Sequence, residues 1–166
     1  MRPTIFLVAG LLAIGGGVVE AEQSSPTTVA ARPTTVLFIC PHAAAKSVLA
    51  SAYFQRMANE RGLSVRVQSA GTDPEPAIAP AVAAHLRNSG YDLPVSTPRK
   101  VRSEDLAFAD VVISIGCDLS GLTAREGSLR QWDEVPALSE NFAVADAAIR
   151  KRVTDLVDEL ARSKQQ

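Results

Sequence analysis

The sequence predicts an α/β fold, a single three-layer domain in which a parallel sheet carries helices on both faces. Short apolar runs that are typical of buried strands alternate with helical patterns, and such an alternation forms a parallel sheet. The expected strands are 35–40, 64–70 and 110–115, and the expected helices are 44–61, 79–89, a short one at 103–108, and 142–162. The chain has 166 residues and 46% hydrophobic content, which suits one domain with an ordinary core.

The first residues stand apart from this alternation. Arg2 precedes an uncharged apolar run from Ile5 to Val19, and Val19-Glu20-Ala21 offers small residues at the spacing of a cleavage site. The run is shorter than the roughly twenty residues of a membrane span. We therefore expect residues 1–21 to be a cleaved signal peptide, with export to a periplasm or secretion, and no stable membrane span after cleavage. A retained membrane anchor is the alternative.

Residues 22–34 follow as a polar, proline-bearing stretch, which predicts a flexible linker. The domain is then expected to run from 35 to 163. Its last helix has direct support, because apolar residues recur there at helical spacing and predict one face packed on the sheet. These residues are Ile149, Val153, Leu156, Val157 and Leu160.

Charge and metal-ligand content exclude several functions. The formal net charge is −1, so no global field recruits nucleic acid or an anionic membrane. Arg99, Lys100 and Arg102 form a local basic run that could guide an acidic or phosphorylated partner, although such runs are usually a solvated face. The chain has two histidines, His42 and His85, too separated for a zinc site. We expect no metal and no cofactor.

The most informative position is Cys40, where the strand Val36-Leu37-Phe38-Ile39 ends and the chain turns toward a helix. A helix N-terminus offers free N–H groups and a positive dipole end, which favour a bound anion and a cysteine thiolate. Lys46 adds a fixed positive charge. The pattern C-x5-K-S, from Cys40 to Ser47, predicts a nucleophile beside an anion site, whereas an isolated cysteine would more often be a small buried apolar residue.

This pattern resembles the low-molecular-weight protein tyrosine phosphatase superfamily, which includes thiol-coupled arsenate reductases. Three further segments sit where that superfamily has similar ones, and the resemblance runs from about Thr35 to Leu160. The segments are Ser69-Ala70-Gly71-Thr72, Asp110-Val111-Val112-Ile113-Ser114-Ile115 and Trp132-Asp133. The resemblance implies a four-stranded sheet in the order 2-1-3-4. Because ligands bind at the carboxyl ends of strands, that order would make Cys40 and Cys117 neighbours.

The resemblance also implies roles for the residues of the site. Cys40 would attack phosphorus and form a cysteinyl-phosphate, which water then hydrolyses. Lys46 would hold the oxygens of the anion, and Ser47 would stabilise the thiolate. The backbone N–H groups around the anion would come from the loop between Cys40 and Ser47, which consists of Pro41, His42, Ala43, Ala44, Ala45 and Lys46.

Three positions differ from the superfamily pattern. Lys46 stands where the superfamily has arginine, and an ammonium offers a point charge instead of two parallel hydrogen bonds. His42 and Ala43 stand where glycine and asparagine are common; His42 could donate to the anion or simply be exposed. The usual acid, an aspartate before proline, is absent from residues 132–137, so Asp133 is the candidate acid and Glu134 the next. Trp132 could be a pocket wall or a core residue.

Three functions follow from these residues. The first is an exported thiol-dependent phosphatase that acts on phosphomonoesters resembling phosphotyrosine, with a phosphoprotein as the substrate. The second is an arsenate reductase in which Cys117 resolves the adduct on Cys40 and an external thiol reductant reopens the disulfide. In an oxidising compartment the same pair could instead be a permanent disulfide. The third is a non-catalytic module that binds an oxyanion such as phosphate or arsenate, or a partner protein.

Overall fold

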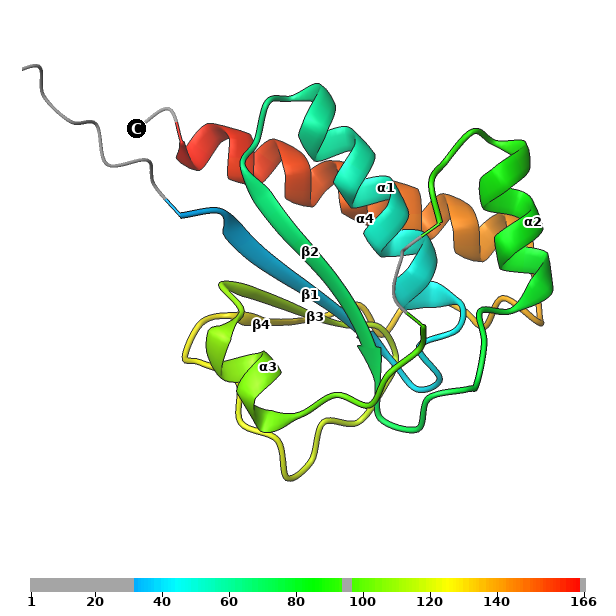
Figure 1. The fold of residues 1–166 in the computed structure, drawn as a ribbon, viewed down its shortest axis with the longest axis horizontal. Helices are drawn as coiled ribbons and strands as arrows, with labels where there is room; N and C mark the ends of the chain where they lie inside the picture. The colour runs from blue at the N-terminus through cyan, green and yellow to red at the C-terminus, as the bar shows by residue number, and fades with distance from the viewer. Residues whose placement is uncertain (1–31, 94–96, 165–166) are drawn as a thin grey trace, which may run out of the picture. The chain divides into compact units, whose positions relative to one another are not determined.

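The computed structural model describes residues 32–93 and 97–164, and these residues build a four-stranded parallel sheet (Figure 1). The strands are β1 (Thr34–Cys40), β2 (Val65–Gly71), β3 (Val111–Ser114) and β4 (Leu129–Gln131). Their order is β2-β1-β3-β4, with β1 between β2 and β3. The predicted sheet and its order are confirmed. The predicted signal peptide and residues 22–31 of the predicted linker lie outside the described residues.

Helices cover both faces of the sheet, as the sequence predicts. The helices α1 (Lys46–Glu60), α2 (Pro80–Asn88) and α4 (Phe142–Ser163) lie over one face, and the short α3 (Ser103–Phe108) lies over the other (Figure 1). Alternate residues of β1 point to opposite faces. Phe38 therefore joins the cluster under α1 and α4, whereas Leu37 packs with Leu106 of α3.

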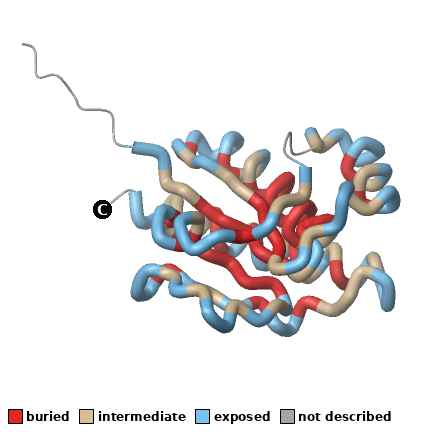
Figure 2. The backbone as a smooth tube through the Cα atoms, turned by 60° about the horizontal axis from the view of Figure 1, so that its bottom comes forward, coloured by how far each residue is buried: buried red, intermediate tan, exposed pale blue. Residues whose placement is uncertain are grey.

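The core lies where the strands run between these helix layers (Figure 2). On α4, Ile149, Val153, Leu156 and Val157 are buried, which confirms the predicted face, and Leu160 packs at its margin. Asn141 caps this helix, because its side-chain oxygen accepts the Val144 N–H at 3.1 Å. One apolar face and one cap thus contribute to the stability of α4.

Two elements differ from the sequence-based expectation. The first helix begins at Lys46 instead of residue 44, because residues 41–45 form a loop between β1 and α1. The sequence also offers no clear pattern for β4, which has three residues, two exposed ends and a half-buried middle. Within the part of the chain that the structure describes, no helix is both long enough and apolar enough to cross a membrane.

Candidate functional site

The carboxyl end of β1 carries a buried thiol beside a buried hydroxyl. Cys40 is 3% exposed, and its Sγ lies 3.1 Å from the Oγ of Ser47 in the first turn of α1. Ser47 is fully buried. When the thiol is ionised, the Ser47 hydroxyl donates to the sulfur and favours the thiolate. The two predicted residues are therefore brought together in the predicted arrangement.

Residues 40–46, called here the oxyanion loop, are fixed from outside by their carbonyl groups. The carbonyls of Pro41, His42 and Ala44 accept N–H groups from Asp73, Glu75 and Ala79 at 2.8, 2.9 and 2.9 Å. In the described part of the chain, no N–H of residues 42–46 donates to a backbone carbonyl. These free donors at a helix N-terminus form a cradle for an anion.

Two small residues allow the oxyanion loop its shape. Ala43 takes a left-handed φ of 51°, a conformation that glycine or asparagine adopts with less strain. Gly71, at the end of β2, lies directly against the loop: a Cβ there would come within 2.6 Å of the Pro41 oxygen and 2.7 Å of the Ala43 nitrogen. The loop therefore depends on the absence of a side chain at position 71.

Lys46 extends from the start of α1 toward two other segments. Its Nζ donates to the carbonyl of Val135 at 3.4 Å. The same atom lies 2.9 Å from the point that a Cβ on Gly116 would occupy. Lys46 is half-buried. The ammonium therefore sits between the loop after β3 and the segment 132–137, and its remaining donors are available to an anion.

Cys117 lies in the loop after β3, half-buried and close to the same ammonium. Its Sγ is 3.3 Å from the Oγ of Ser114, a fully buried residue of β3. Burial raises the pKa of the Cys117 thiol, and the charge of Cys40 raises it further. Ser114, the Ile115 N–H and the Lys46 charge act in the opposite direction. Both cysteines are free thiols in this structure.

The leaving-group segment, residues 132–137, contributes little to the site through its carboxylates. Asp133 is exposed, and no hydrogen bond of its side chain is found within residues 32–93 and 97–164. Glu134 forms an ion pair with Arg152, which lowers the pKa of that carboxyl. The residue before Pro136 is Val135, which is 3% exposed. An apolar side chain thus occupies the place before the proline.

Two other predicted positions have mainly structural contacts. The Nδ1 of His42 lies 3.2 Å from the Asp73 carbonyl oxygen and 3.9 Å from the Glu75 carboxylate. His42 is exposed, so these contacts join the oxyanion loop to the segment after β2. Trp132 is buried and packs on Phe38, with ring centroids 5.8 Å apart. Trp132 is therefore a core residue.

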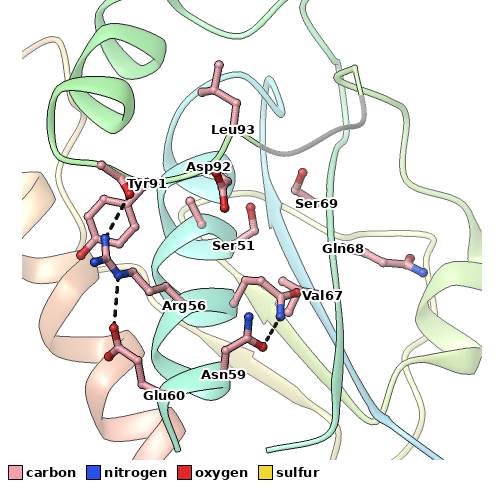
Figure 3. Close-up of a pocket in the computed structure, with 13 residues that line it drawn as sticks. Ser51, Arg56, Asn59, Glu60, Val67, Gln68, Ser69, Tyr91, Asp92 and Leu93 are labelled. Carbon is pink, nitrogen blue, oxygen red and sulfur yellow. Dashed lines mark hydrogen bonds and ion pairs between the residues drawn. The ribbon is translucent and has the colours of Figure 1, made fainter. Parts of the chain in front are cut away.

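A hollow of about 630 Å³ lies away from the oxyanion loop, between α1, β2 and residues 90–93. Arg56 lies over the ring of Tyr91 at 4.8 Å and forms an ion pair with Glu60, so its charge is already engaged (Figure 3). No residue of the oxyanion loop lines this hollow. The reactive groups of the chain therefore lie elsewhere, at the carboxyl ends of β1 and β3.

Three residues of the site were not singled out by the sequence-based argument. Ser114, Gly116 and Val135 touch the reactive groups through a hydroxyl, a missing side chain and a backbone carbonyl. The Gly-Cys pair after the third strand is a local signal for the first two. A backbone carbonyl leaves no signal in a sequence.

A buried thiol at the carboxyl end of a parallel strand, followed by a helix N-terminus and a cation, defines a class of cysteine-dependent enzymes that act on oxyanions. The sequence profile of the low molecular weight phosphotyrosine protein phosphatases matches residues 35–151 of this chain. The chain belongs to that family, and it is a member of the phosphatase-like or arsenate reductase-like kind.

Two similar proteins are named as arsenate reductases. A Halobacterium salinarum protein named "Putative arsenate reductase" is 32% identical over 127 residues, and the match covers 74% of this chain and 89% of that protein. The thioredoxin-dependent arsenate reductase of Corynebacterium glutamicum has a TM-score of 0.69 and 28% identity, and the match covers 81% of this chain but only 65% of that one.

A phosphatase also shares the fold. The low molecular weight phosphotyrosine phosphatase of Vibrio cholerae has a TM-score of 0.64 and 21% identity, with 76% of this chain and 96% of that one covered. At this identity, the likeness shows the fold alone.

Proposed function

We propose that the chain reduces arsenate, with Cys40 as the nucleophile and Cys117 as the resolving thiol. The observation that carries this proposal is the second thiol beside the site: Cys117 is close enough to Cys40 and Lys46 for both charges to act on its pKa. The residue before Pro136 is a buried valine, so this position offers no carboxylate for ester hydrolysis. The two relatives named as arsenate reductases support the same activity.

The reaction would proceed in two balanced steps. The Cys40 thiolate attacks arsenic(V), an S–As bond forms, and one oxygen leaves as water after protonation. The Cys117 thiolate then attacks the Cys40 sulfur: the S–S bond forms, the S–As bond breaks, and its electron pair stays on arsenic, which leaves as arsenite. Two thiols are thereby oxidised and arsenic is reduced. An external dithiol reductant restores both thiols.

A single-turnover measurement tests this proposal. The reduced full chain is mixed with arsenate, and arsenite, free thiols and the disulfide-linked peptides are quantified. We expect one arsenite per chain, the loss of both thiols and a Cys40–Cys117 disulfide. Cys117→Ser should stop arsenite release and Cys40→Ser should prevent the first step. Arsenite release by Cys117→Ser without added thiol, or no arsenite from the native chain, would overturn the proposal.

The second candidate is hydrolysis of phosphomonoesters, with a phosphoprotein as the substrate. The Cys40–Ser47 contact and the free N–H groups of the oxyanion loop favour it. Phosphate release from an aryl phosphate that needs Cys40 but not Cys117 would identify this activity. Protection of Cys40 from alkylation by phosphate or arsenate, without turnover of either kind, would identify a binding module instead.

The apolar run from Ile5 to Val19 supports export of the protein to a periplasm or its secretion. The small residues of Val19-Glu20-Ala21 support cleavage of the signal peptide near Ala21. In such a compartment the reductant would have to be an exported thiol system. Fractionation of cells, combined with N-terminal sequencing of the protein, tests both statements. Intact Met1 in the cytoplasmic fraction would contradict them.

A further inference from the structure

We propose that Gly116 is a positioning residue. The space left by its missing side chain, called here the seat, holds the Lys46 ammonium where it reaches both the anion and the second thiol. This inference rests on the proposed function and adds to it a residue outside the oxyanion loop. It starts from one close approach: a Cβ on Gly116 would lie 2.9 Å from the Lys46 Nζ. That separation is shorter than real Cβ contacts, so a side chain here requires the flexible end of Lys46 to shift away from its position.

The seat has three sides, and each comes from a different part of the fold. Lys46 enters from the first turn of α1, Gly116 closes the end of β3, and the Val135 carbonyl accepts from Nζ at 3.4 Å. A lysine side chain has four flexible bonds and gains no fixed orientation by itself. The seat supplies the orientation, because the backbone at 116 and 135 limits where the ammonium can go.

The seated charge acts on two groups. The ammonium belongs to the last residue of the oxyanion loop, and after one N–H has gone to the Val135 carbonyl it has two donors left for an anion. It also faces Cys117, whose thiolate it favours together with Ser114 and the Ile115 N–H, against burial and the charge of Cys40. A displaced ammonium therefore weakens anion binding and disfavours the Cys117 thiolate at the same time.

A glycine in the same loop provides a matched control. Gly116 has φ +60° and Gly121 has φ +81°, so alanine at either position meets the same left-handed backbone. At Gly121 nothing lies within 4 Å of the added Cβ. Gly121→Ala thus reproduces the backbone strain of Gly116→Ala without touching Lys46.

The first experiment measures how well inorganic phosphate or arsenate protects Cys40 of the full chain from iodoacetamide. We expect Gly116→Ala to raise the half-protecting concentration about tenfold, the equivalent of one hydrogen bond to a charged group. Gly121→Ala should change it by less than about twofold. In a Lys46→Met background, Gly116→Ala should have no further effect, because the group that it displaces is gone.

The second experiment needs no anion. In a Cys40→Ser background, Cys117 is the only thiol, and its alkylation rate is followed against pH. We expect the midpoint to move to higher pH with Gly116→Ala and with Lys46→Met, and to stay in place with Gly121→Ala.

Equal behaviour of Gly116→Ala and Gly121→Ala in both experiments would overturn the seat. If Gly116→Ala does not fold but the double variant Gly116→Ala with Lys46→Met does, the clash with Lys46 is established directly. If neither folds while Gly121→Ala does, position 116 serves the backbone alone and the proposal is overturned. Absence of anion protection in the native chain, with the Cys117 shift present, would overturn the proposed function and retain the seat.

Discussion

The nucleophile side of the site and the leaving-group side are built to different degrees. On the nucleophile side, Cys40 is buried against Ser47, and the oxyanion loop is tied down by three backbone hydrogen bonds. On the leaving-group side, Asp133 is exposed, Glu134 is engaged with Arg152, and the residue before Pro136 is a buried valine. The thiolate is therefore held in place for attack, whereas no carboxylate of residues 132–137 is held beside the thiol by a hydrogen bond within the described residues.

Arsenate reduction makes use of this difference. Its second step uses a second thiolate where hydrolysis uses water: an S–S bond forms, the S–As bond breaks, and the electron pair of that bond stays on arsenic. Cys117 stands on the side of the site where β3 ends, beside the Lys46 charge. Variants of each side test this difference.

The largest effect is expected from Cys40→Ser, because every proposed reaction begins with this thiolate. We expect both arsenite release and aryl phosphate hydrolysis to fall by at least about a thousandfold. Arsenite is measured in single turnover and phosphate release under steady state, with circular dichroism as the control for folding. Retention of a tenth of either rate would show that another group is the nucleophile.

Cys117→Ser should separate the two chemistries. We expect arsenate turnover to be lost, while protection of Cys40 by phosphate changes less than about threefold, because the variant keeps the size and leaves the oxyanion loop intact. Arsenite release and Cys40 alkylation are measured on the same sample. Loss of both properties would mean that Cys117 supports the loop and does not act as a resolving thiol.

Val135→Asp tests whether the missing acid is what limits hydrolysis. A carboxylic acid before Pro136 should raise aryl phosphate hydrolysis about a hundredfold, the usual contribution of a positioned acid. Val135→Asn is the matched control, since it has the same shape and the same burial cost without the proton. Equal rates for the two variants would show that the leaving-group side is limited by something other than an acid.

The pH dependence of disulfide closure reports on the second thiol. Because burial raises the pKa of Cys117, the thiolate fraction keeps growing with pH beyond the ordinary thiol range. We therefore expect the rate of disulfide closure, measured in stopped flow after arsenate addition, to be still rising at pH 9, which is the ordinary pKa of a cysteine. A plateau near neutral pH would contradict the raised pKa.

Ser114→Ala should slow closure about fivefold at pH 8. Its hydroxyl donates to the Cys117 carbonyl at 2.9 Å and lies 3.3 Å from the sulfur, so its loss releases the loop and raises the pKa of the thiol further. The control is Ser128→Ala: Ser128 is also buried, but its hydroxyl donates to the Arg125 carbonyl, away from the thiols. An equal effect of the two variants would assign the change to lost packing.

The sequence predicted much of the fold because its patterns are local. The apolar strand before Cys40, the helical face of α4 and the alternation of elements can each be read from neighbouring residues, and the structure agrees with them. β4 could not be located, because a three-residue strand with exposed ends carries no alternation. The start of α1 was placed two residues early, since alanines 43–45 favour a helix while the loop has to turn.

The nucleophile side could likewise be predicted, since Cys40, Lys46 and Ser47 lie within eight residues of one another. The rest of the site depends on segments that only the sheet order brings together. That Lys46 reaches the Val135 carbonyl, 89 positions away, and the space left by Gly116 are results of packing. No local sequence pattern predicts which backbone carbonyl accepts a hydrogen bond from a lysine ammonium.

The smallest effect is expected from Asp133→Asn, at the candidate acid of the sequence-based argument. Its carboxylate is exposed, and within the described residues no donor orients it toward Cys40. A group without orientation contributes little as an acid. We therefore expect less than about a twofold change in aryl phosphate hydrolysis and in arsenite release, measured beside Glu134→Gln. A tenfold loss of hydrolysis alone would identify Asp133 as the acid. The segment 132–137 would then have to close over the substrate, and the two sides of the site would be equally complete.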